Sequence, residues 1–251
     1  MASIALSKAS IAALKKELHE FYSDIKSSHL AEAIANALDR NTYASLMADV
    51  KSLSIDPPLV LLHDDPFFKR LTALGYADDP EFSFELFPIP EIISTIPRSA
   101  YDIEYRSARE KAWRNIMVCG INEGLKQKLF SLKPNDNRWP GALAPDDYSY
   151  SEGHVFEFIL PNGLNAKAYV NDASFEELVI HVGVNPKGDI VRHWNPGFTA
   201  GEAFAMGWLE RRTGAWLQTT DLFHCRRNLL SSLASMNAKP MGYGDRGRVI
   251  M

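Results

Sequence analysis

Alternating apolar and polar residues predict an antiparallel sheet in the second half of the chain. The alternation runs through three segments, which are 154–160, 166–170 and 178–184. Asn162-Gly163 separates the first two, and Asn-Gly favours a hairpin because both residues tolerate a positive φ. The Asn185-Pro-Lys-Gly188 sequence is typical of a second turn, with a return strand over 189–194. The pattern therefore predicts four strands arranged as two hairpins.

The second turn decides whether two histidines meet. If it is a type I turn followed by a glycine bulge, His181 faces His193 across the strands, with about 5 Å between their Cβ atoms. Such a pair can contribute to a metal site or to proton transfer. A zinc site needs three or four protein ligands, and the nearest further candidates are His154, Glu157 and Asp172. The alternative is a solvated sheet face on which two histidines meet.

Helical periodicity predicts three helices around this sheet. The longest pattern spans 102–132 and has Gly120 and Gly124 on its apolar side, which indicates either the close approach of another element or a kink. Thr199 and Glu202 form a capping-box sequence, so a helix is expected from there to Gly214, covering the sheet. The last helix is predicted over 221–237, and the tail after it is either a mobile arm or a strand docked at a sheet edge.

Three further helices are predicted near the N-terminus, over 10–25, 28–38 and 42–50. The break at Asp39-Arg-Asn41 suggests a helix-turn-helix. However, the position expected to be buried in the second helix is Ser45, and Leu46 comes one place late. A compact packing or interaction module is the alternative to DNA binding.

The segment 54–101 is rich in proline, phenylalanine and carboxylates, and we expect it to be an ordered connection with a short helix at Phe67–Leu74. His63-Asp64-Asp65 is either a helix cap or a metal-binding fragment. The domains predicted are a helical module (1–53), this proline-rich connection (54–101) and an α+β domain (102–251). The expected fold class is α+β, with an N-terminal three-helix module and a four-stranded antiparallel sheet packed against about three helices.

Residues 10–50, in particular Ser28-His-Leu-Ala-Glu32 and Thr42-Tyr-Ala-Ser-Leu46, resemble the small helical domain called glyoxalase-related, which occurs in uncharacterised bacterial proteins. Asp39 stands where that pattern usually has glycine. This resemblance implies a bacterial cytosolic protein and does not imply glyoxalase chemistry. Residues 113–140 resemble uncharacterised proteins of integrating conjugative elements, which suggests an accessory factor of a mobile element.

Composition narrows the function classes. The chain has 251 residues and a formal charge of −4, which fits a globular protein and decides nothing about nucleic acid. It has no apolar run of the length that a membrane span needs, so we expect no membrane association. Cys119 and Cys225 have no metal-like spacing, lie on apolar patterns and indicate core thiols in a reducing cytosol. No phosphate loop or nucleophile elbow occurs, and we expect no cofactor.

Basic residues on the predicted helices suggest how the protein acts. The candidate nucleic-acid-binding residues are Arg106, Arg109, Lys111, Arg114, Arg226 and Arg227. Alternatively, they form solvated helix faces or pair with the acidic segment. The sequence favours a non-catalytic interaction protein of the bacterial cytosol, with a protein or nucleic-acid partner. The competing hypothesis is a metal-dependent hydrolase that uses His181, His193 and Glu157.

Overall fold

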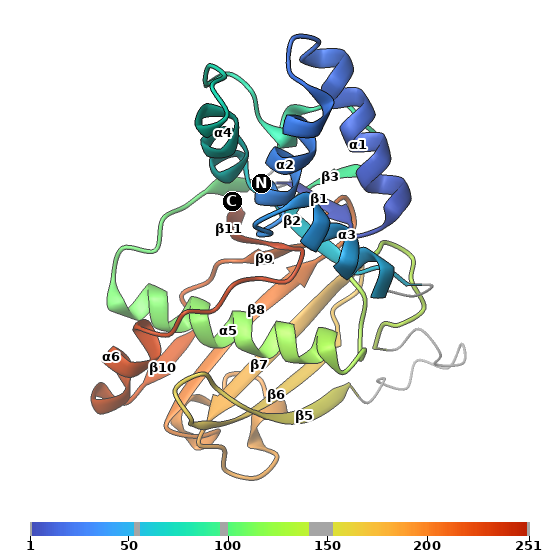
Figure 1. Cartoon of the computed structure of the whole chain (residues 1–251). Coiled ribbons are helices and arrows are strands. Elements are labelled where there is room, and N and C mark those ends of the chain that lie inside the picture. Colours follow the sequence, from blue (N-terminus) through green and yellow to red (C-terminus); the bar gives the residue numbers. More distant parts are fainter. Residues whose placement is uncertain (1, 53–55, 96–99, 141–152, 250–251) are drawn as a thin grey trace. The chain divides into compact units, whose positions relative to one another are not determined.

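The computed structural model describes residues 2–52, 56–95, 100–140 and 153–249 (Figure 1). Contacts between residues group the chain into two compact units, residues 1–95 (unit 1) and 96–251 (unit 2). The domain boundaries predicted from the sequence follow residues 53 and 101. Each unit contains helices and a sheet of its own, so the chain is an α+β protein, as the sequence predicts.

Unit 1 combines a three-stranded antiparallel sheet with helices. The strands, in order across the sheet, are β2 (Leu59–Leu62), β1 (Ala2–Ala5) and β3 (Ile92–Ser94). The helices are α1 (Lys8–Phe21), α2 (Ser27–Ala37), α3 (Tyr43–Ser52) and α4 (Asp64–Ala73), with a 3-10 turn at Phe84–Leu86. The helical predictions for this unit are confirmed. The strands were not predicted, because each has only three or four residues and shows too little periodicity.

Local sequence explains the helices of unit 1. The Ser7 hydroxyl accepts a hydrogen bond from the Ser10 N–H and caps α1, whose apolar stripe at Ile11, Leu14 and Leu18 is fully buried. Asp39 follows α2 with φ 58°, a left-handed conformation that aspartate tolerates better than most residues. The turn after α2 therefore forms with aspartate at the position where the glyoxalase-related pattern usually has glycine.

The sheet of unit 2 has eight strands, and the prediction of four is wrong. Their order is β4 (Ala100–Asp102), β11 (Gly244–Val249), β9 (Trp216–Gln218), β8 (Ala203–Glu210), β7 (Glu177–Val184), β6 (Asn165–Asp172) and β5 (His154–Ile159), while β10 (Phe223–Cys225) pairs with β8. Strands β9 and β11 are parallel, whereas the other pairs are antiparallel. The tail is thus a strand inside the sheet, paired on both sides.

The first predicted hairpin is confirmed and the second is wrong. Strands β5 and β6 pair around Gly163, which has φ 84°. After β7 the chain turns away at Asn185 (φ 48°), and the segment predicted as a strand contains a 3-10 helix at Ile190–Arg192. Besides β6, the strand that pairs with β7 is β8. The Asn185-Pro-Lys-Gly188 sequence correctly predicts a turn. It does not determine which later segment pairs with β7.

The predicted helix over 199–214 is also wrong, because half of these residues form the central strand β8. The Glu202 carboxylate accepts a hydrogen bond from Asn185 Nδ2 at 2.6 Å instead of closing a capping box. Small residues (Ala203, Ala205, Gly207) alternate with large ones along β8, which is a strand pattern. Packing of the small residues of β8 against a helix contributes more to the conformation of this segment than its capping-box sequence does.

Two helices, α5 (Ala108–Lys126) and α6 (Arg227–Ala234), complete unit 2, and both are shorter than predicted. Helix α5 begins with a capping box between Ser107 and Glu110 and lies across one face of the sheet (Figure 1). A Cβ on Gly120 would lie 2.8 Å from Val182 Cγ2, and one on Gly124 would lie 2.9 Å from Phe130 Cζ. The close approach indicated by the two glycines is therefore confirmed.

Replacing Gly124 with alanine tests this packing. Alanine favours a helix by about 1 kcal/mol, but the added carbon meets the Phe130 and Phe156 rings, and overpacking costs about 1–3 kcal/mol. We expect a lower free energy of unfolding, measured in urea by tryptophan fluorescence. All five tryptophans lie in residues 96–251, so the signal reports on unit 2. Lys111→Ala, on the exposed side of α5, should change the free energy by less than about 0.5 kcal/mol. Equal or greater stability of the Gly124 variant would contradict the packing.

Candidate interaction surface

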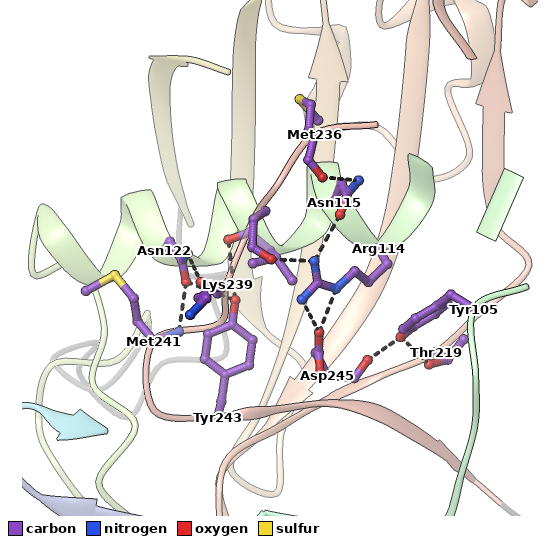
Figure 2. A network of polar contacts seen from close by, with 12 residues as sticks. Tyr105, Arg114, Asn115, Asn122, Thr219, Met236, Lys239, Met241, Tyr243 and Asp245 are labelled. Atoms are coloured by element: carbon purple, nitrogen blue, oxygen red, sulfur yellow. Dashed lines mark hydrogen bonds and ion pairs between the residues drawn. The ribbon is translucent and has the colours of Figure 1, made fainter. Parts of the chain in front are cut away.

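Arg114, a predicted nucleic-acid-binding residue, lies in a polar network beneath α5 (Figure 2). Its guanidinium donates to the Asp245 carboxylate from Nε and Nη2, both at 2.6 Å, and these side chains are only 19% and 7% exposed. Its Nη1 donates to the Ala238 carbonyl and, at 2.9 Å, to Asn115 Oδ1. Arg114 therefore fixes the C-terminal segment to α5.

Two asparagines of α5 extend this network along the helix (Figure 2). Asn115 Nδ2 donates to the carbonyls of Leu233 and Met236, both at 2.9 Å. Asn122 Oδ1 accepts from the Met241 N–H and the Tyr243 hydroxyl, both at 3.1 Å. The Tyr243 ring is fully buried, and this burial raises the pKa of its hydroxyl well above the ordinary value. We call Arg114, Asn115, Asn122, Tyr243 and Asp245 the α5 network.

Sequence reasoning missed the two asparagines, although a signal was present. Residues 115 and 122 are seven positions apart and therefore lie on one face of a helix. A polar pair of this kind within an apolar helix indicates a buried hydrogen-bonding stripe, because buried amides need partners.

Of the other candidate nucleic-acid-binding residues, some interact with other side chains or carbonyls of the chain and some do not. Arg109 donates to the Phe223 carbonyl and stacks over the Phe223 ring, with 5.1 Å from Cζ to the ring centroid. Arg106 pairs with Glu104 at 3.5 Å, and Arg226 pairs with Glu202 at 3.4 Å. In the described part of the chain, the exposed side chains of Lys111 and Arg227 have no ion-pair partner. Three of the six cations thus have carboxylate partners in the chain, which leaves less free positive charge than the sequence suggests.

The predicted cross-strand pair of His181 and His193 is wrong. His181 is paired in the sheet with Tyr169 and Met206, whereas His193 follows the 3-10 helix and is exposed. Glu157 is exposed and forms an ion pair with Lys167 at 2.9 Å. Within the described ranges, no three His, Cys, Asp or Glu side chains are grouped so that they could hold a metal ion.

His181 is instead buried, with 2% of its surface exposed. Its Nδ1 lies 2.8 Å from the Val191 carbonyl and donates to it, and its ring packs between Tyr169 and Phe204 at centroid distances of 5.7 and 5.8 Å. Nε2 has no hydrogen-bond partner among the described residues. Burial lowers the pKa of His181, and its hydrogen bond to Val191 opposes this only partly. His181 is therefore a neutral structural residue that anchors the segment after β7.

The two cysteines are also unlike nucleophiles. Burial raises the pKa of Cys119 to about 11 and raises the pKa of Cys225 as well. A thiol with a raised pKa stays protonated at neutral pH, and the thiolate is the reactive form.

The sheet face turned away from α5 carries a set of aromatic side chains. A Cβ on Gly207 would meet the Trp113 ring of α5 at 3.1 Å, so the neighbouring β8 residues Met206 and Trp208 point to the opposite face. Trp194 lies 6.3 Å from Trp208 between ring centroids and is 69% exposed. We define the aromatic surface as Trp194, Phe198, Trp208 and His224; Phe198 is 46% exposed and packs edge-on against His224 at 5.6 Å.

The segment that carries Trp194 and Phe198 is held in place by packing. Val191 and Ala200 are buried against Phe204 and Met206 of β8. The sequence placed Trp194 in a strand and gave no role to Phe198, because only the folded chain brings this segment over β8.

Comparison of the chain with protein-family models, curated proteins and solved structures gave no match. The two resemblances inferred from the sequence therefore stay predictions. Of the helices in the described ranges, none is long and apolar enough to cross a membrane.

The α5 network yields a stability prediction. Removing one partner of a buried ion pair costs about 3–5 kcal/mol, because the other charge is left without compensation. We expect Arg114→Ala to lower the free energy of unfolding of unit 2 by about this amount in urea titrations followed by tryptophan fluorescence. Arg106→Ala is the control, because its side chain is 86% exposed and such pairs contribute less than about 1 kcal/mol. Equal effects of the two substitutions would contradict a structural role for Arg114.

His181 yields a pH prediction. Because its pKa in the folded chain lies below the ordinary value of 6.5, the unfolded chain binds more protons as the pH falls through 6.5. Stability should therefore be full above pH 6.5 and decrease below it, with a slope of up to about 1.4 kcal/mol per pH unit from this residue. In urea titrations between pH 7.5 and 5, His181→Gln should show a smaller loss than the natural chain. Parallel pH profiles would refute the assignment.

Proposed function

We propose that the chain is a non-catalytic interaction protein of the cytosol that binds a partner protein through its aromatic surface. The observation that supports this most directly is the exposure of Trp194 (69%) and Phe198 (46%) on a segment fixed by buried residues. Each ring packs on a second one, Trp194 on Trp208 and Phe198 on His224, and exposed apolar clusters are typical of binding surfaces. Tryptophan is enriched among the residues that contribute most to protein–protein affinity.

The way this surface is held favours binding without rearrangement. Trp194 packs on Trp208, and the carbonyl of Val191 accepts the hydrogen bond of buried His181. Ordering a loop on binding reduces affinity, so a segment that is already fixed retains more of its contact energy.

Part of the positive charge in this region is neutralised within the chain, whereas Lys187 and Arg192 have no ion-pair partner among the described residues. Lys167 is neutralised by Glu157 and Asp189, at 2.9 and 3.5 Å, and Arg226 by Glu202. Affinity for nucleic acid comes largely from cations that replace counterions on phosphates. Cations that already have carboxylate partners contribute less to such binding.

Affinity capture with matched variants tests the proposal. Tagged natural chain, Trp194→Ala, Phe198→Ala and Tyr101→Ala are incubated with a nuclease-treated lysate of the source cells, and each captured protein is then purified for a direct binding measurement. We expect one protein that the natural chain and Tyr101→Ala bind alike, with at least a tenfold weaker Kd for the Trp194 and Phe198 variants. Tyr101 is a suitable control because it is 47% exposed on β4, at one end of the sheet.

Two outcomes would overturn the proposal. Capture that is the same for all four chains would show that the aromatic surface is not the binding site. Binding of a single-stranded oligonucleotide that depends on Trp194 would make nucleic acid the partner, since bases stack on exposed aromatic rings.

A further inference from the structure

Unit 1 contains a groove with a different chemistry. It is a cavity of about 760 Å³ beside α4, and its lining includes four carboxylates and two aromatic rings, which are Asp64, Asp65, Asp78, Asp79, Phe68 and Phe82. Lys69 is a cation in the same lining. The volume lies within the range of about 300–1,000 Å³ that is usual for ligand sites. We call this cavity the acidic groove.

Two of its carboxylates are fixed by the fold. Asp64 accepts hydrogen bonds from the Ser83 hydroxyl at 2.9 Å and the Phe84 N–H at 3.0 Å. Asp79 accepts from the Tyr22 hydroxyl at 2.9 Å. The walls of the acidic groove are therefore held in position from three separate segments of unit 1.

The other two carboxylates are available to a ligand. Within the described ranges, Asp65 and Asp78 take part in no hydrogen bond or ion pair through their side chains. Both line the cavity, so a bound cation could reach them without breaking an existing contact.

Aromatic side chains connect the lining of the groove to the exposed Phe21 ring. Phe82 packs on Phe68 at 5.5 Å and on Phe21 at 6.0 Å between ring centroids. Phe21 also packs edge-on against Phe87 at 5.7 Å, yet it remains 59% exposed at the end of α1. Exposed apolar area thus lies beside unpaired negative charge.

The charge of unit 1 determines which ligand fits. Residues 1–95 contain fourteen carboxylates and eight Lys or Arg side chains, a net charge of −6, whereas the remaining residues carry +2. A field of this sign repels nucleic acid and anionic lipid surfaces and attracts cationic partners. Complementary charge therefore selects a basic polypeptide, and the aromatic rings of the lining favour apolar side chains in it.

We propose that the acidic groove binds a basic amphipathic segment of a partner protein. Its Lys or Arg side chains pair with Asp65 and Asp78, while its apolar side chains pack on Phe21 and Phe82. This mode follows the general pattern in which an amphipathic helix lays its apolar face into a groove. The proposal is independent of the aromatic surface of unit 2.

Synthetic peptides test it on the full chain. The probes are a fluorescent Leu/Lys peptide of about 18 residues with leucines at helical spacing, a scrambled peptide of the same composition, and a Leu/Glu version. In fluorescence anisotropy titrations we expect the helical Leu/Lys peptide to bind at least tenfold more tightly than the scrambled peptide. We expect no binding of the Leu/Glu peptide.

Variants locate the site. Asp65→Asn, Asp78→Asn and Phe21→Ala should each weaken binding of the Leu/Lys peptide about fivefold or more. Asp49→Asn removes the same charge on α3, where Asp49 already pairs with Arg40 at 2.5 Å, and should change binding less than twofold. Trp194→Ala should leave peptide binding unchanged, so this result is separate from the test of the aromatic surface.

Several results would overturn the proposal. Equal binding of the helical and scrambled peptides, or an equal effect of Asp49→Asn and Asp65→Asn, would reduce the interaction to unspecific attraction by net charge. Unchanged binding by Phe21→Ala would remove the apolar part of the site. Circular dichroism of each variant checks that it is folded.

Discussion

Unit 2 depends on the buried pair between Arg114 and Asp245. The two side chains come from residues far apart in the sequence, and the pair fixes the C-terminal segment under α5. Asp245 lies in β11, which pairs in the sheet with β4 on one side and β9 on the other. Burying two charges is costly unless their remaining hydrogen-bonding groups are satisfied. Here the Ala238 carbonyl and Asn115 Oδ1 accept further hydrogen bonds from the Arg114 guanidinium.

The two faces of this sheet are covered differently. On one face, Gly120 and Gly124 let α5 approach so closely that little more than a hydrogen atom fits at these positions. The opposite face is covered only in part, by the segment that His181 anchors through Val191. The uncovered remainder, around Trp194, is the aromatic surface. A core built against one face thus leaves the other available for binding.

The units offer surfaces of unlike character. The aromatic surface of unit 2 consists of rings on a fixed segment and on the strands β8 and β10. The acidic groove of unit 1 combines rings with carboxylates, two of which are not paired. Surfaces of this kind discriminate between partners by charge as much as by shape. The two surfaces therefore differ in the side chains that a partner would need in order to bind them.

The sequence by itself determined most helices, the first hairpin and the burial of alternate residues in β6 and β7, because these depend on contacts near in the chain. Its apolar periodicity also placed Gly120 and Gly124 correctly at a close approach. Only the tertiary structure decided the partner of β7, the strand β8 in place of a helix, and the buried role of Arg114. It also separated His181 from His193 and brought Trp194 to Trp208. Each of these features depends on which distant segment packs beside a given strand. That pairing is set by how well side-chain volumes fit and by how buried charges are paired across the whole unit, and neither can be read from a short stretch of sequence.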